Sequence, residues 1–109
     1  MSNPLRGELT INLGSDQFNC KLNFDSIVRI ETALDIPIIR LASKVSEANL
    51  KITELSYILF TAIKGGGTEI TEKEVNNLIW KHGMVDAIKC VGEIITVALS
   101  SGDDTEKKS

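Results

Sequence analysis

Residues 8–24 read ELTINLGSDQFNCKLNF, and this stretch decides the class of the fold. Apolar residues take alternate positions on both sides of Gly14: Leu9, Ile11 and Leu13 before it, and Phe18, Cys20, Leu22 and Phe24 after it. Alternation with period two is typical of a strand that buries one face, and a turn around GSD (14–16) joins the two runs into a predicted β-hairpin. Because an isolated two-stranded hairpin is marginal in water, we expect it to pack on the rest of the chain.

The residues after the hairpin show helical periodicity. Asp25 is the predicted N-cap of a first helix. Pro37 ends that helix, because the residue before a proline is pushed out of the α region, and it opens a second helix over PIIRLASKVSE (37–47). A third helix is predicted to open at Thr53, with a core-facing stripe of Leu55, Ile58, Leu59, Ala62 and Ile63.

Three consecutive glycines, Gly65, Gly66 and Gly67, follow the third helix. A glycine run before a helix either cradles a phosphate or lets the chain turn. Gly65 stands where a left-handed cap favours glycine, and we predict that it ends the helix in that conformation. The P-loop pattern needs Gly-Lys-Ser/Thr, whereas Thr68 and Glu69 follow here, so we interpret the run as a turn.

A fourth helix begins after Thr71, which forms a predicted capping box with Glu74. Gly83 is its predicted end, and a broadly apolar fifth segment covers residues 84–99. The sequence thus predicts an α+β fold, in which an N-terminal β-hairpin packs on a bundle of four to five α-helices. We expect one domain over residues 1–100 and a disordered polar tail over residues 101–109.

The composition limits the class of protein. Of 109 residues, 42% are hydrophobic and 25% are charged, as in an ordinary globular domain that needs neither metal nor disulfide. The 12 basic and 15 acidic residues are interspersed without a basic stripe, which argues against a nucleic-acid partner. No apolar run reaches the length of about 18 residues that a membrane span needs, and we expect a cytoplasmic protein without a membrane partner.

The residues that could carry chemistry are few and scattered. His82 is the only histidine, and we predict that it caps the last turn of the fourth helix. Cys20 and Cys90 are expected as reduced, partly buried thiols, with a single long-range disulfide as the alternative. Trp80 and Tyr57 are expected to fill the core rather than to anchor an interface. No cluster indicates a catalytic, metal or cofactor site, and we predict that the protein is not an enzyme.

The order of several motifs resembles a known family. NPLRGE (3–8), the hairpin, RIETAL (29–34) and AIKGGG (62–67) recur together in gene-transfer-agent family proteins of phage-like particles, which are grouped with phage tail assembly chaperones. The resemblance spans residues 3–99. The motif residues are Asn3, Pro4, Arg6, Gly7, Glu8, Gly65, Gly66 and Gly67. The use of Ile, Lys and Asn where such proteins are often Ala-rich and Arg-rich is a departure.

The resemblance implies a role in tail morphogenesis without catalytic residues. Such chaperones are thought to coat the tail tape measure protein, a long helical chain with apolar faces, until tail tube subunits polymerise around it. One alternative is that the chain is itself a tail tube component, with the tail tube protein as its partner and the phage-like particle as its location. Another is a small cytoplasmic helical adaptor. Self-association into a homo-oligomer stays open.

Two apolar helix faces are the candidate surfaces for such a partner. The last helix carries one, and the helix after Pro37 carries the other; the candidate partner-binding residues are Ile38, Ile39, Leu41, Val45, Val85, Ile88, Val91 and Ile95. Either face suits an amphipathic helix lying in a groove. The competing interpretation is that both faces are used up in the core of this protein.

Overall fold

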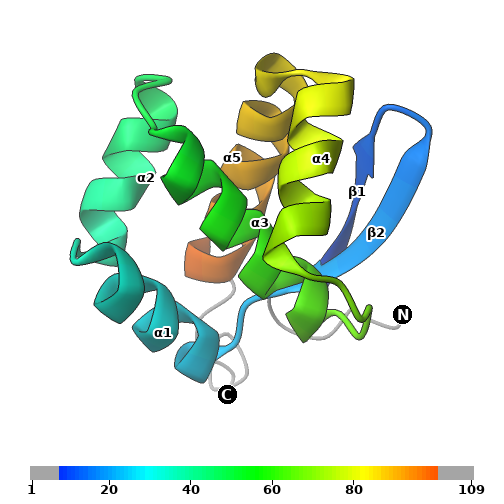
Figure 1. Cartoon of the computed structure of the whole chain (residues 1–109). Helices are drawn as coiled ribbons and strands as arrows, with labels where there is room; N and C mark the ends of the chain where they lie inside the picture. Colours follow the sequence, from blue (N-terminus) through cyan, green and yellow to red (C-terminus); the bar gives the residue numbers. More distant parts are fainter. Residues whose placement is uncertain (1–7, 101–109) are drawn as a thin grey trace.

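The hairpin and five helices follow one another in the computed structural model, which describes residues 8–100 (Figure 1). The elements are β1 (Glu8–Leu13), β2 (Asp16–Lys21), α1 (Phe24–Leu34), α2 (Ile38–Ser46), α3 (Ile52–Gly65), α4 (Glu72–His82) and α5 (Met84–Ser100). The predicted α+β class is therefore confirmed, with five helices as the upper of the two expected numbers. The predicted tail over residues 101–109 lies outside the described residues.

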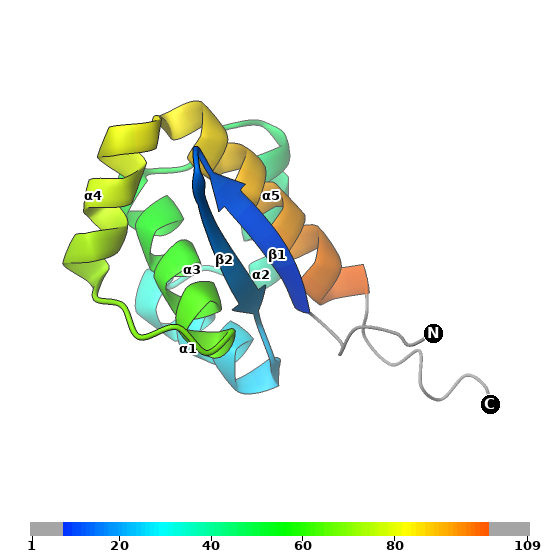
Figure 2. The ribbon, with the colours of Figure 1, turned by 90° about the vertical axis from the view of Figure 1, so that its right-hand side faces the viewer.

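The two strands form an antiparallel sheet that packs on α3 and α5 (Figure 2). Leu13 pairs with Asp16 across the two residues of the turn, and Gly14 there holds φ at +62°. The pair that closes such a turn exchanges backbone hydrogen bonds, and every second pair after it does the same. In the pairs between them, including Thr10 with Asn19, the backbone N–H and C=O groups point away from the partner strand. Helices α3 and α5 meet these outward groups, one on each edge of the hairpin.

The edge of β2 lies against the glycine end of α3. A Cβ built on Gly65 would overlap the carbonyl oxygen of Lys21, and one built on Gly66 would overlap that of Asn19. On the other edge, the Sγ of Cys90 in α5 donates to the carbonyl oxygen of Asn12 at 3.3 Å. The glycines are therefore required for the close approach of α3 to the hairpin.

The predicted role of Gly65 is wrong in its detail. Gly65 is the last residue of α3, and Gly66, with φ at −83°, ends the helix. Positive φ is found at Gly67, at +106°. The helix continues through Gly65 because the amide of Gly66 still bonds the carbonyl of Ala62, at 3.0 Å, while the turn follows two residues later.

Local side-chain bonds decide where the other helices begin. The predicted cap Asp25 is wrong: the carboxamide oxygen of Asn23 accepts from the backbone N–H of Ser26 at 2.8 Å, so α1 already begins at Phe24. Phe24 leaves the buried face of the hairpin for this reason and is 78% exposed. The Thr71 and Glu74 capping box of α4 is confirmed, with both reciprocal bonds present.

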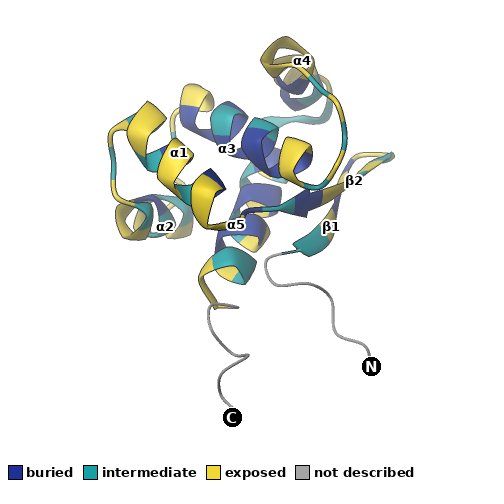
Figure 3. Cartoon of the chain, turned by 90° about the horizontal axis from the view of Figure 1, so that it is seen from below, coloured by how far each residue is buried: buried dark blue, intermediate teal, exposed yellow. Residues whose placement is uncertain are grey.

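Helix α3 lies at the centre of the molecule and contacts α1, α4, α5 and β2 (Figure 1). Buried residues gather where the elements face one another, while the outer faces of α1 and α2 are exposed (Figure 3). The stripe predicted for α3 is fully buried. The core side chains are Ile11, Leu13, Cys20, Leu22, Ile30, Leu41, Leu55, Ile58, Leu59, Ala62, Ile63, Val75, Ile79, Ala87, Cys90, Val91, Ile94 and Ile95.

Two polar contacts join the helices across this core. The Nζ of Lys44 in α2 lies 2.9 Å from the Oε2 of Glu54 in α3, and the backbone N–H of Lys51 donates to the other carboxylate oxygen of Glu54. The hydroxyl of Ser56 in α3 donates to the side-chain oxygen of Asn76 in α4. Glu54 and Ser56 thus each have a partner, which offsets the cost of burying their polar groups.

Candidate functional site

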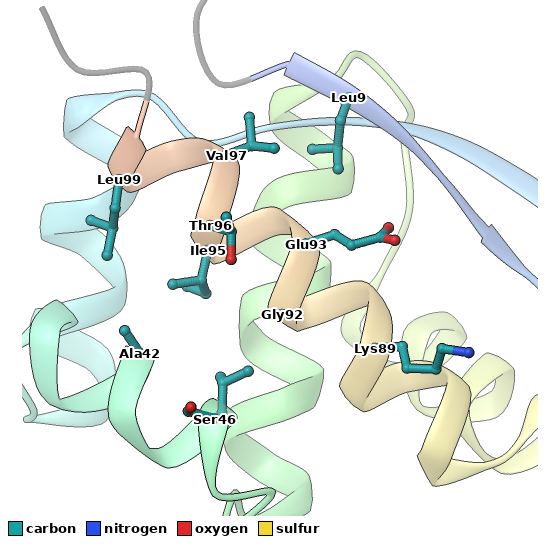
Figure 4. Close-up of a pocket in the computed structure, with 11 residues that line it drawn as sticks. Leu9, Ala42, Ser46, Lys89, Gly92, Glu93, Ile95, Thr96, Val97 and Leu99 are labelled. Carbon is teal, nitrogen blue, oxygen red and sulfur yellow. The ribbon is translucent and has the colours of Figure 1, made fainter.

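An open apolar groove runs over the outer face of α5, between α2 on one side and the start of β1 on the other (Figure 4). Its volume is about 700 Å³. The residues that line it are Leu9, Ala42, Val45, Ser46, Lys89, Gly92, Glu93, Ile95, Thr96, Val97 and Leu99. Methyl and methylene groups form most of the lining, and Lys89 and Glu93 are its only charged side chains.

Three elements position these side chains. Leu9 comes from β1, whereas Ala42 and Ser46 come from α2, on the other side of α5 (Figure 4). At Gly92, an added Cβ would lie 3.3 Å from a methyl carbon of Val45, so the absence of a side chain there lets α2 lie close to α5. The lining of the groove is therefore shared by α5, α2 and β1, with α2 and α5 in close contact at Gly92.

The candidate partner-binding residues divide into three groups in the structure. Leu41, Val91 and Ile95 are buried in the core, although Ile95 also borders the groove. Ile38, Val45 and Ile88 are half-buried, and Val45 lines the groove. Ile39 and Val85 are 66% and 72% exposed. Their role in binding stays a prediction.

Leu9, Gly92, Thr96 and Leu99 were not among the predicted partner-binding residues, but the structure brings them to the groove. Leu9 was assigned to the buried face of the hairpin, and it is half-buried there. Gly92 stands in the interior of a predicted helix, and an interior glycine is a sequence signal for a close approach at its position. The meeting of β1 with α5 is long-range and has no local signal.

The prediction that Trp80 fills the core is wrong. Its side chain is 91% exposed on α4. The buried positions of α4 are Val75 and Ile79, and successive helix positions are about 100° apart, so Trp80 falls on the outer face. Tyr57 is half-buried, with its ring centroid 6.1 Å from that of Phe60.

The single histidine contacts the hairpin rather than capping its own helix. The Nε2 of His82 lies 2.9 Å from the Oδ2 of Asp16, and the ring covers Gly14 in the turn, where an added Cβ would overlap it. This contact replaces the predicted role as a cap of the last turn. It ties the end of α4 to the hairpin and is a structural contact.

Both cysteines are buried free thiols. Burial, followed by the neighbouring Cys90 thiol, raises the pKa of Cys20 to about 12. The pKa of Cys90 is also raised, by burial and then by the carboxylates of Glu93 and Asp86. A nucleophilic cysteine needs the opposite shift, so neither thiol is activated.

Metal-ligating residues do not gather in the part of the chain that the structure describes. Between residues 8 and 100, no three side chains of His, Cys, Asp or Glu lie close enough to hold a metal ion. Helices within the same range all fall short of the length and apolar character that crossing a bilayer requires.

The family motif is only partly described by the structure. Asn3, Pro4, Arg6 and Gly7 lie outside the described residues. Glu8 opens β1, and Gly65 and Gly66 allow the contact between α3 and β2. The glycine part of the motif thus has a packing role.

Comparison with known proteins identifies the family. A family model described as phage tail tube protein, GTA-gp10, matches residues 6–101, which include the hairpin, all five helices and the glycine run. No curated protein and no solved structure matches the chain. The expected resemblance is confirmed: the chain belongs to the GTA-gp10 family of phage and gene-transfer-agent tail proteins.

Proposed function

We propose that this protein is a non-enzymatic tail morphogenesis protein that acts as an assembly chaperone for the tail tape measure protein in the cytoplasm of the host bacterium. The family supplies the setting, a phage-like tail. The observation that carries the chaperone role is the open apolar groove over α5. A chaperone of this kind needs an apolar acceptor surface and no catalytic group.

The groove suits an amphipathic helix better than a small molecule. It is bounded by two helices and a strand and lies open along one side, and its charged groups stand at one flank. An amphipathic helix docks by placing apolar residues at positions i, i+3, i+4 and i+7 into such a groove. A tape measure protein presents this pattern repeatedly along a long helical chain.

Weak individual contacts suffice for this role. Several copies of the chaperone along one tape measure protein cover its apolar faces together, and each contact stays reversible. Reversibility is required, because tail tube subunits must replace the chaperone as they polymerise. Ile39 on α2 and Trp80 on α4 are further exposed apolar side chains, outside the lining of the groove.

A second candidate is a structural component of the tail tube. The description of the matching family as a tail tube protein favours it. A tube component remains in the finished particle, whereas a chaperone is absent from it. Immunoblotting or mass spectrometry of purified particles therefore separates the two roles: stoichiometric amounts of this chain in particles would favour the tube component.

Co-expression with the tape measure protein encoded beside this gene tests the chaperone role. We expect the tape measure protein to become soluble and to elute with this chain in gel filtration. Thr96→Lys, which places a charge in the groove, should abolish both effects. Thr32→Lys is the matched control, because Thr32 is exposed on α1 and is not part of the groove lining.

The chaperone role fails if the client stays insoluble and no complex survives gel filtration. It fails equally if Thr96→Lys and Thr32→Lys solubilise the client to the same extent. In that second case a complex forms, but the groove is not its site.

A further inference from the structure

The outer face of α5 carries a seam of five residues with Gly92 in the middle. Val85, Lys89, Gly92, Thr96 and Leu99 follow one another at alternating spacings of four and three, so they share one face of the helix. This spacing is that of the contact positions in a helix pair. The two ends of this face are exposed, Val85 by 72% and Leu99 by 38%, while Val45 of α2 lies against Gly92 at its middle.

The two apolar residues of the seam stand at equal distances from its centre. Val85 precedes Gly92 by seven residues, and Leu99 follows it by seven. If a second α5 crosses the first at Gly92 in the antiparallel direction, Val85 of each helix meets Leu99 of the other. The two exposed apolar side chains then cover each other, and the pairing occurs twice by symmetry.

The charged side chains of the seam fit the same arrangement. Lys89 and Glu93 project from the same side of α5 (Figure 4). Within residues 8–100 neither of them forms an ion pair, since the only ion pairs there are Lys44 with Glu54 and His82 with Asp16. A two-fold axis perpendicular to two antiparallel helices brings the same side of each helix together. Lys89 of one copy then faces Glu93 of the other, twice.

Gly92 lies beside Val45 of α2 and forms part of the floor of the groove. It has no side chain at the centre of the seam, and the next seam positions on either side are a flexible lysine and a small threonine. The adjoining groove is apolar and lies open along α5, so a second helix can sink between α2 and β1. The small residues, the charged pair and the apolar ends of the seam are all complementary to a second copy of α5.

We propose that the chain forms a two-fold symmetric homodimer through the α5 seam, defined by Val85, Lys89, Gly92, Thr96 and Leu99 with Glu93 at its side. The partner is a second copy of this protein, and the contact is antiparallel. The dimer closes the groove over α5, so self-association and the binding of an apolar client helix exclude each other. The dimer itself does not depend on the proposed function; only this competition rests on it.

Sedimentation equilibrium of the purified full chain over a range of concentrations tests the dimer. We expect a monomer–dimer equilibrium in the wild type. Val85→Asp should raise the dissociation constant by about tenfold or more, because it places a carboxylate against Leu99 of the second copy. Val28→Asp, the same change at a 43% exposed position on α1, should leave the dissociation constant unchanged.

A charge exchange gives the sharper test. Lys89→Glu and Glu93→Lys should each weaken the dimer, since each places like charges together, and the double variant should recover most of the wild-type affinity. A wild type that stays monomeric at every concentration overturns the proposal. So does a dimer that Val85→Asp does not weaken, or one in which the double exchange gives no recovery.

The competition is measured separately. An apolar client helix, added as a peptide from the tape measure protein, should shift the wild-type dimer towards a one-to-one complex. A dimer with the expected variant effects, but no binding of the peptide, would contradict the chaperone role and leave the interface standing. Binding of the peptide to an intact dimer would refute the claim that dimer and client use the same surface of α5.

Discussion

The Nε2 of His82 lies 2.9 Å from the Oδ2 of Asp16, and this contact joins the end of α4 to the turn of the hairpin across 66 positions of sequence. The histidine side chain is 10% exposed and the aspartate side chain is 41% exposed. The imidazole ring also covers Gly14. One side chain therefore fixes the hairpin turn both by packing and by a polar bond.

His82→Ala should lower the free energy of unfolding by about 1 to 2 kcal/mol at neutral pH, because it removes a buried ring and leaves the turn uncovered. Asp16→Asn should have a smaller effect, about 0.5 kcal/mol, since the carboxylate is partly solvated. Urea denaturation of both variants and of the double variant measures their coupling. Strictly additive effects would mean that the polar bond contributes nothing and that His82 acts through packing alone.

The glycine run should be more sensitive to alanine at Gly66 than at Gly67. Gly66→Ala is expected to lower the free energy of unfolding by about 2 to 3 kcal/mol, because the new Cβ would overlap the carbonyl of Asn19. Gly67→Ala should cost about 1 kcal/mol through its positive φ, as it has open space around it. Chemical denaturation measures both. The reverse order of the two effects would contradict the close approach of α3 to β2.

The ionised carboxylate of Glu54 should stabilise the folded state at neutral pH but not in acid. Burial alone would raise its pKa, but the backbone N–H of Lys51 and the ammonium of Lys44 outweigh burial and hold the pKa below its ordinary value of 4.5. The stabilisation is therefore present above pH 4.5 and is lost as the pH falls through the folded-state pKa. Urea midpoints from pH 3 to 7 should show a smaller acid-induced loss in Glu54→Gln than in the wild type. Parallel curves would exclude this linkage.

Trp80 should behave as an exposed indole. It is the only tryptophan in the chain, so its fluorescence reports this one position. We expect emission typical of a solvated indole, efficient quenching by acrylamide in the native state, and a change in stability within about 0.5 kcal/mol for Trp80→Ser. A blue-shifted emission of the isolated monomer, or strong destabilisation by Trp80→Ser, would show that the residue is covered.

Both thiols should resist modification in the native protein. Burial raises the pKa of Cys20 to about 12 and also raises that of Cys90, so almost no thiolate is present at neutral pH. Titration with a thiol-reactive disulfide reagent should be slow for the folded chain and should give two thiols per chain in denaturant. Fast reaction of one thiol under native conditions would contradict its burial.

Elements that depend on neighbours in the chain could be predicted from the sequence. The period-two alternation of residues 9–22 and the stripe of α3 correctly predicted the hairpin and the central helix, because a strand or helix with one buried face imposes its own period on the sequence. The Thr71 capping box was predictable because the bonds that begin a helix join residues three positions apart. Asn23 was missed because two acceptable cap residues, Asn23 and Asp25, lie within three positions.

What the sequence by itself determined is the set of elements, their order and most of their buried faces, since these depend on interactions between near neighbours in the chain. The tertiary structure alone decided that Gly65 and Gly66 face the carbonyls of β2, that His82 reaches Asp16, and that Leu9 meets α5 at the groove. It also decided that Trp80 faces solvent. These outcomes depend on how elements far apart in sequence are oriented against each other, and periodicity along one helix or strand carries no information about that orientation.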